Sequence, residues 1–157
     1  MTLATTKQTK ALEYASIGQE LTLASSAART ATAGTNGTAF PLAGIFSRVA
    51  VVCTFTAKAT EVDDTCDVYV DVLIGSTWIN AIHFTRALGN GTDAATEYAI
   101  LDPTNPGTDI VVATADAASA KVRPSLFGSQ IRARWVIVDA GGTAASFTFS
   151  VTGYAIK

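Results

Sequence analysis

The chain has 157 residues, 48% of them hydrophobic and 15% charged, with a formal net charge of −2. A chain of this length is the usual size of one domain and can bury a core without a disulfide or a metal. It holds no run of the roughly 18 apolar residues that a membrane-spanning helix needs, and its basic residues form no stripe for nucleic acid. We therefore expect neither a membrane nor a nucleic acid as partner.

The first 20 residues are rich in Thr, Lys and Gln, which predicts an extended N-terminal arm, with a short helix over Lys10–Gln19 as the alternative. The segment has no apolar core of signal-peptide length, so we expect no export by that route and synthesis in a reducing compartment. Residues 21–157 are predicted to form one domain. It begins with a short strand at Leu21–Leu23 and a long loop of small polar residues over 24–38.

Most of the remaining chain alternates between apolar and polar residues, the pattern of half-buried strands. Turns rich in Gly, Pro and Asn separate these stretches. This spacing predicts an all-β fold, an antiparallel β-sandwich of seven or eight strands that resembles a jelly roll. The predicted strands cover residues 48–58, 64–74, 78–84, 97–101, 109–115, 131–139 and 146–156.

The alternation also assigns faces to side chains. In the second of these strands we expect Asp67 and Asp71 to face solvent, opposite a row of Cys and Val residues. In the third, Trp78 is expected on the core face together with Ile82 and Phe84. Trp135 is likewise expected in the core. In the last strand, the core positions are Phe147, Phe149 and Val151.

The two cysteines are expected to be small buried thiols. Cys53 and Cys66 would face each other if strands 48–58 and 64–74 formed a hairpin, so a disulfide is the alternative. A zinc site is disfavoured, because two cysteines without further Cys or His ligands nearby cannot complete a tetrahedral site.

Nothing in the sequence indicates an enzyme or a cofactor. His83 is the only histidine, and no Gly-x-Ser-x-Gly nucleophile elbow is present. We expect His83 to be a surface or interface side chain.

The densest acidic group comprises Glu61, Asp63, Asp64, Asp67 and Asp71. Carboxylates can hold Ca²⁺, but this spacing does not match the known Asp-x-Asp-x-Asp-Gly calcium loop. We expect no metal site here, and calcium binding is the alternative.

Four stretches of the chain resemble small virion structural proteins of tailed bacteriophages. They are Asp67–Ile74, Thr77–Phe84, Ile131–Ile137 and Ser146–Thr152. The resemblance covers residues 48–157 and implies a β-sandwich protein of the head, neck or tail, located in the virion after assembly in the host cytoplasm. It also implies an N-terminal arm that reaches neighbouring subunits.

Together, these features favour a capsid decoration protein that binds the lattice of the major capsid protein, or other virion proteins, as a homo-oligomer. The low charged fraction supports this, because an average soluble domain has ~25% charged residues. A neck or tail protein and a carbohydrate-binding jelly roll using Trp78 or Trp135 are the alternatives. The uncharged outward side chains of the last strand and the apolar side chains of the arm are the predicted interface. These residues are Leu3, Leu12, Tyr14, Ile17, Thr148, Ser150, Thr152 and Tyr154.

Overall fold

The computed structural model describes residues 18–30, 32–42, 46–91, 95–104 and 115–157. All regular secondary structure in these ranges is β-strand, so the predicted all-β fold is confirmed. The strands are β1 (Gly18–Thr30), β2 (Thr32–Asn36), β3 (Phe40–Pro41), β4 (Arg48–Ala57), β5 (Thr65–Ile74), β6 (Thr77–His83), β7 (Ala87–Leu88), β8 (Ala95–Leu101), β9 (Lys121–Val122), β10 (Gln130–Val138) and β11 (Ser146–Ile156).

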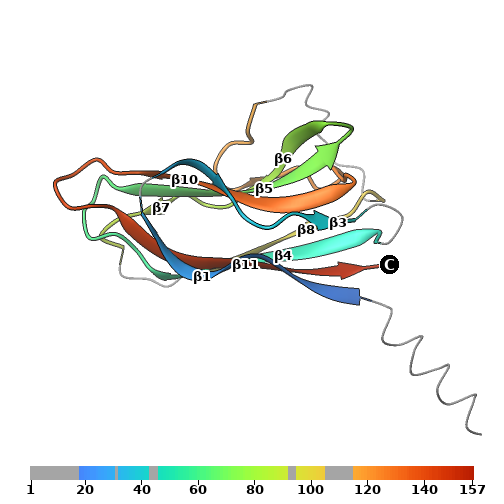
Figure 1. Ribbon diagram of the computed structural model, residues 1–157, viewed down its shortest axis with the longest axis horizontal. Coiled ribbons are helices and arrows are strands. Elements are labelled where there is room, and N and C mark those ends of the chain that lie inside the picture. Colours follow the sequence, from blue (N-terminus) through green and yellow to red (C-terminus); the bar gives the residue numbers. More distant parts are fainter. Residues whose placement is uncertain (1–17, 31, 43–45, 92–94, 105–114) are drawn as a thin grey trace, which may run out of the picture.

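Two antiparallel sheets lie face to face (Figure 1). The first has the order β1-β11-β4-β8. The second has the order β2-β10-β5-β6-β9, with β3 beside β10 and β7 beside β5. Without the two-residue strands β3, β7 and β9, eight main strands remain. Their first, eighth, third and sixth members form one sheet and the others form the second, which is the jelly-roll arrangement.

The first strand is much longer than its sequence predicts. We expected a loop over residues 24–38, but β1 continues to Thr30 and β2 follows almost at once. That expectation is wrong because the ladder is built from backbone groups, which small polar residues also supply. The partner is the last strand, paired from Gly18↔Ile156 to Thr30↔Ser146 with register shifts in the middle.

The same ladder shows where the predicted N-terminal arm has to end. Residues 18–20, assigned to the arm by the sequence, are paired with β11, and Glu20 lies opposite Tyr154. The predicted arm can therefore comprise at most residues 1–17, which lie outside the described residues.

Six of the other predicted strands are found within two residues of their expected bounds, as β4, β5, β6, β8, β10 and β11. The strand predicted over residues 109–115 falls, apart from Ala115, outside the described residues.

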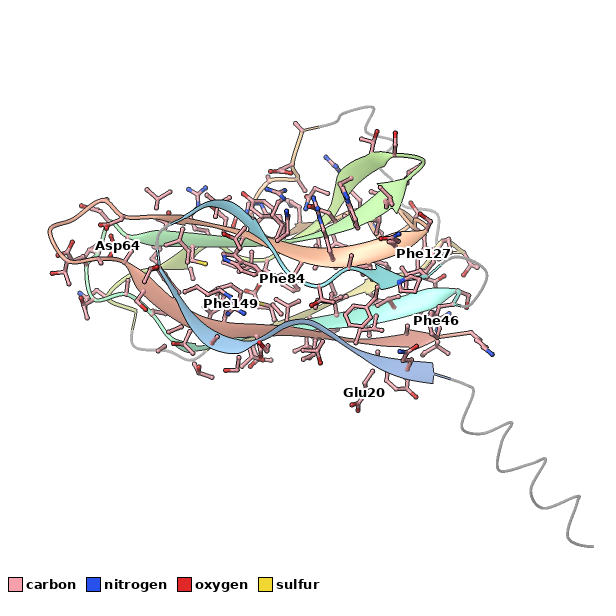
Figure 2. All side chains as sticks on the ribbon, in the orientation of Figure 1. Glu20, Phe46, Asp64, Phe84, Phe127 and Phe149 are labelled. Carbon is pink, nitrogen blue, oxygen red and sulfur yellow. The ribbon has the colours of Figure 1, made fainter. Side chains whose placement is uncertain are left out.

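The core fills the space between the two sheets, where Figure 2 shows Phe84 and Phe149. The ring of Phe149 lies 5.2 Å from that of Phe55 and 5.6 Å from that of Trp135, which joins the two sheets. Full burial of one such side chain stabilises a fold by about 1.5–3 kcal/mol. The inward positions predicted for β11, Phe147, Phe149 and Val151, are all fully buried.

Arg29 holds the second half of β1 against this aromatic cluster. Its guanidinium lies 4.2 Å from the centre of the Phe149 ring and 4.6 Å from that of Trp135. It also donates to the carbonyl oxygen of Phe149 at 2.6 Å. Burial lowers the pKa of this arginine. The contacts explain how a strand of small residues stays attached to the sandwich.

A bulge in β6 changes the face on which Trp78 lies. Val70 pairs with Ile82, whereas Asp71 pairs with Asn80, so Ala81 is an extra residue without a partner in β5. An extra residue reverses the alternation. Ile82 and Phe84 are in the core as predicted, but Trp78 is on the outer face and only half-buried. Its predicted core position is therefore wrong.

The cysteines are buried free thiols, as predicted, with Cys53 2% and Cys66 0% exposed. The hairpin considered for them does not form, because β4 pairs with β11 and β8 while β5 pairs with β10 and β6. Burial raises the pKa of Cys53 to about 12 and also raises that of Cys66. Both groups therefore stay as unreactive thiols at neutral pH.

Both thiols should resist modification in the native protein. At pH 8 we expect Cys53 and Cys66 to react with a disulfide reagent such as Ellman's reagent only at the rate of unfolding, and at once in guanidinium chloride. Absorbance at fixed reagent concentration measures both rates. Rapid stoichiometric labelling of the native chain would contradict the buried positions.

Candidate functional site

The two outer faces of the sandwich differ in what covers them. The outer side of β5, β6 and β10, here called the covered face, carries a network of charged side chains beneath residues 115–123. The outer side of β1, β11, β4 and β8, here called the open face, carries almost no charge.

Asp67 is the centre of one half of the covered face. Its carboxylate accepts hydrogen bonds from His83 Nε2 at 2.8 Å and from Arg86 Nε at 2.9 Å. A second Arg86 nitrogen lies 2.9 Å from its other oxygen, so the arginine binds both carboxylate oxygens. The hydrogen bond that Arg86 donates to Asp67 raises the pKa of Arg86. This buried carboxylate is therefore fully paired.

Both ring nitrogens of His83 are occupied. Nδ1 lies 2.7 Å from the carbonyl oxygen of Ala117, which can only accept, and Nε2 faces Asp67. The ring also packs on Tyr69, 4.3 Å between centres. His83 is 5% exposed, so its predicted surface or interface position is wrong. Because both ring nitrogens have partners, His83 has a structural role in this network.

Asp71 is the centre of the other half. It binds Arg134 Nε at 2.9 Å and lies 3.6 Å from Arg132, while Arg134 reaches on to Asp116 at 2.6 Å. The guanidinium of Arg132 lies 4.0 Å from the centre of the Trp78 ring. The charges of the covered face thus compensate one another.

Residues 115–123 fix this network from outside. The Ala117 amide donates to Asn80 Oδ1 at 2.9 Å, and Arg123 donates to the Asn80 carbonyl oxygen at 2.9 Å. Asp67 and Asp71 are consequently 4% and 3% exposed. Their predicted solvent exposure is wrong, because period-two alternation shows that residues share a face but not whether another segment covers it.

The open face is built from three rows of side chains that run across β11, β4 and β8. The pairings are Tyr154–Ala50–Ile100, Thr152–Val52–Tyr98 and Ser150–Thr54–Thr96. None of these nine side chains is charged. Among the described residues, the charged side chains of this face lie at its margins, with Glu20 on β1 and the Arg48–Asp102 ion pair at one end. Figure 2 shows Glu20 projecting away from the sandwich on this side.

Large apolar groups are exposed on the open face. Tyr98 is 76% exposed, and Ile100 and Tyr154 are each 45% exposed. A shallow depression of about 310 Å³ lies beside Tyr154, lined by Ala50, Val52 and Thr152 among others. Uncharged centres with exposed tyrosines and charged margins are typical of protein–protein interfaces. The open face is therefore the candidate functional site.

The structure brings together only part of the interface predicted from the sequence. Thr148, Ser150, Thr152 and Tyr154 all lie on the outer side of β11, and the last two are exposed. The predicted arm residues lie outside the described residues. They are Leu3, Leu12, Tyr14 and Ile17.

The parts of the open face contributed by β4 and β8 were not predicted from the sequence. Val52 is paired with Thr152, and Tyr98 and Ile100 follow one strand further along the same rows. A signal was present, because the central outward positions of strand 48–58, from Ala50 to Thr56, are as free of charge as those of the last strand. What was missing was the knowledge that these strands are neighbours.

Neither tryptophan presents an open ring face on which a sugar could stack. Trp135 is 7% exposed and packs in the core, as predicted. Trp78 is half-buried, with Arg132 stacked on its ring. The described residues also include no helix long and apolar enough to cross a membrane.

No protein-family model matches the sequence, and a search of curated proteins also finds no match. Among solved structures, the chain is similar to a chain in the structure of infectious bursal disease virus, Gx strain. The TM-score is 0.52 at 10% identity, over 88% of this chain and 32% of that one. What they share is the fold. A chain of the VP2 subviral particle of the same virus matches at 12% identity over 88% and 32% of the two chains, with a TM-score of 0.47. The chain thus spans about a third of these viral chains.

The covered face should contribute to stability through its buried carboxylates. Replacing Asp67 by Ala leaves the buried His83 and the Arg86 guanidinium without their acceptor, and we expect a loss of about 3 kcal/mol in the free energy of unfolding. Urea unfolding at neutral pH measures the loss. Asp116→Ala is the control, because that half-exposed partner of Arg134 should cost under about 1 kcal/mol. Equal losses for both variants would contradict the central position of Asp67.

Proposed function

We propose that this chain is a structural protein of a virus particle, and specifically a capsid decoration protein of a tailed bacteriophage. In this proposal it binds the lattice of the major capsid protein as a homo-oligomer and reinforces the shell without catalysing a reaction or carrying a cofactor. The observation that carries the proposal is the open face: an uncharged sheet surface with exposed tyrosines on one side of a jelly roll. The shared fold with a chain of a virus structure supports a place in a particle.

The size of the open face indicates how it would be used. Strands about 4.8 Å apart and about 3.3 Å of rise per residue give a four-stranded face of seven residues an area on the order of 400 Å². A standard stable interface buries about 800 Å² on each partner. The open face alone therefore supplies about half of such an interface. Residues 1–17, which precede β1 at the margin of this face, would supply further contact.

The charge distribution favours contact with protein over contact with nucleic acid. The centre of the open face has no charged side chain, so docking there requires no buried ion to be desolvated. On the covered face, Arg86, Arg132 and Arg134 all neutralise carboxylates. Nucleic-acid binding is driven by basic side chains that replace the counterions of phosphates, and these arginines are already paired with carboxylates.

A neck or tail protein of the virion is the second candidate, because the same face could dock on a portal or tail tube. Gold-conjugated antibodies against this chain, applied to purified particles, would label the head in the first case and the neck or tail in the second. The carbohydrate-binding alternative draws no support from either tryptophan.

Introducing a charge on the open face should weaken assembly. We expect Tyr98→Lys to reduce binding to shells that lack this chain by at least about tenfold, since an unpaired charge would be buried in the interface. Co-sedimentation with such shells measures the binding. Val122→Lys on strand β9 is the matched control, because it adds the same charge to a 40% exposed position of the other sheet. Equal binding by both variants would remove the open face from the proposal.

Removing the arm should weaken binding while the domain stays folded. The deletion has to end at residue 17, since a longer one would remove residues of β1 that pair with β11. We expect the truncated chain to keep the melting temperature of the full chain within a few degrees and to lose binding to shells. Circular dichroism and co-sedimentation measure the two properties. Unchanged binding would show that residues 1–17 make no essential contact.

A further inference from the structure

Three carboxylates from two different loops converge at one end of the sandwich. Glu61 and Asp64 belong to the loop between β4 and β5, and Asp139 follows β10 directly. One carboxylate oxygen from each lies within 4.8 Å of the other two. Figure 2 shows Asp64 at this end of the molecule, away from the C-terminus marked in Figure 1. The group is distinct from both outer faces.

Each carboxylate uses one oxygen to hold the loop between β10 and β11. Glu61 Oε1 accepts from the Thr143 amide at 2.9 Å, and Asp64 Oδ1 accepts from the Ala140 amide at 3.0 Å. Asp139 Oδ1 accepts from the Gly141 amide at 3.3 Å. The side chains are thus fixed in direction, and their other oxygens remain for another partner.

The remaining oxygens of the two inner carboxylates are buried and have no donor. Asp64 is 1% exposed, and its Oδ2 atom has no hydrogen-bond partner. Glu61 Oε2 is likewise buried and unpartnered. No Lys or Arg pairs with any of the three carboxylates within the described ranges. Buried carboxylate oxygens without a donor or counter-charge are costly, which indicates a missing positive partner.

The backbone around this pair leaves no room for a side chain to fill the gap. A Cβ atom at Gly141 would overlap the carboxylate of Glu61, and one at Gly89 would overlap the Glu61 carbonyl group. Glycine at position 141 lets the β10–β11 loop approach the Glu61 carboxylate closely, and Gly89 lets the segment after β7 approach the backbone of Glu61. The partner must therefore be small.

We propose that Glu61, Asp64 and Asp139 form a calcium site that joins the two loops. All ligand atoms are oxygens, the donors that Ca²⁺ takes, and His or Cys ligands that would favour zinc or copper are absent from the cluster. Two oxygens bound to one Ca²⁺ at about 2.3–2.6 Å can be up to roughly 5 Å apart, a limit that the cluster meets. Both loops cross from one sheet to the other, so the ion links the sheets.

The site was not visible as a sequence motif because its third ligand is distant in the chain. Asp139 lies far from Glu61 and Asp64 in sequence, and the acidic group noted in the sequence divides in the structure. Asp67 and Asp71 belong to the covered face, where His83 and the arginines pair with them. The acidic group noted in the sequence and this cluster therefore share only Glu61 and Asp64.

Thermal unfolding of the full chain tests the site. With three oxygens from protein and the rest from water, we expect a dissociation constant of about 0.1–1 mM, as in extracellular calcium modules. After removal of metals with EDTA, about 10 mM CaCl₂ should raise the melting temperature by roughly 5–10 °C if the ion reaches about 100 times its dissociation constant. MgCl₂ at the same concentration should raise it by less. Isothermal titration with CaCl₂ should show a single saturable site.

Single substitutions make the test specific. Asp139→Asn and Asp64→Asn should each abolish the calcium-dependent shift, whereas Asp63→Asn, an exposed neighbour outside the cluster, should keep it. If Asp64→Asn does not fold, Asp139→Asn decides alone, because its side chain is exposed. Absence of a shift in the unmodified chain, or an equal shift in Asp139→Asn and Asp63→Asn, would overturn the proposal. The result is independent of whether the chain binds a capsid.

Discussion

Pairing of β11 with β1 on one side and β4 on the other is the interaction on which the rest of the structure depends. It joins the first and last described strands of the chain, and it places β4, and through it β8, in the same sheet. The inward side chains of β11 fill the core beneath this sheet, where Phe149 contacts Trp135 of the opposite sheet. Its outward Ser, Thr and Tyr residues become the middle of the open face. One strand thus supplies both the core and the candidate interface.

The two outer faces show how the same sheet pattern leads to different surfaces. On the covered face, carboxylates on β5 are buried beneath residues 115–123, and they stay there because arginines and His83 provide hydrogen-bonded counter-charges. On the open face no segment among the described residues lies over the sheet, and the side chains need no counter-charge because they have none. A surface of this kind remains available to a partner. The proposed assembly role follows from that difference.

The jelly-roll path has a further consequence at the ends of the sandwich. Chain crossings between sheets bring the β4–β5 loop against the β10–β11 loop, although their sequences are far apart. Backbone amides of one loop are satisfied by carboxylates of the other. The same crossings explain why Cys53 and Cys66 do not belong to one hairpin, since consecutive strands β4 and β5 lie in opposite sheets.

Alternation of apolar and polar residues, a local property with a period of two, was enough to predict six of the main strands and most of their inward positions. It therefore predicted the sandwich, the core positions of β11 and the outward row from Thr148 to Tyr154. Long-range pairing decided the rest. Only the tertiary structure showed that small residues before Thr30 form a strand, because their partner is the end of the chain. Only it placed Tyr98 in one row with Thr152 across β4, turned Trp78 outward through the extra residue in β6, and brought Asp139 to Asp64. In each case the contact depends on which backbone segments pair and which residues are buried. The local alternation of apolar and polar residues does not contain that information.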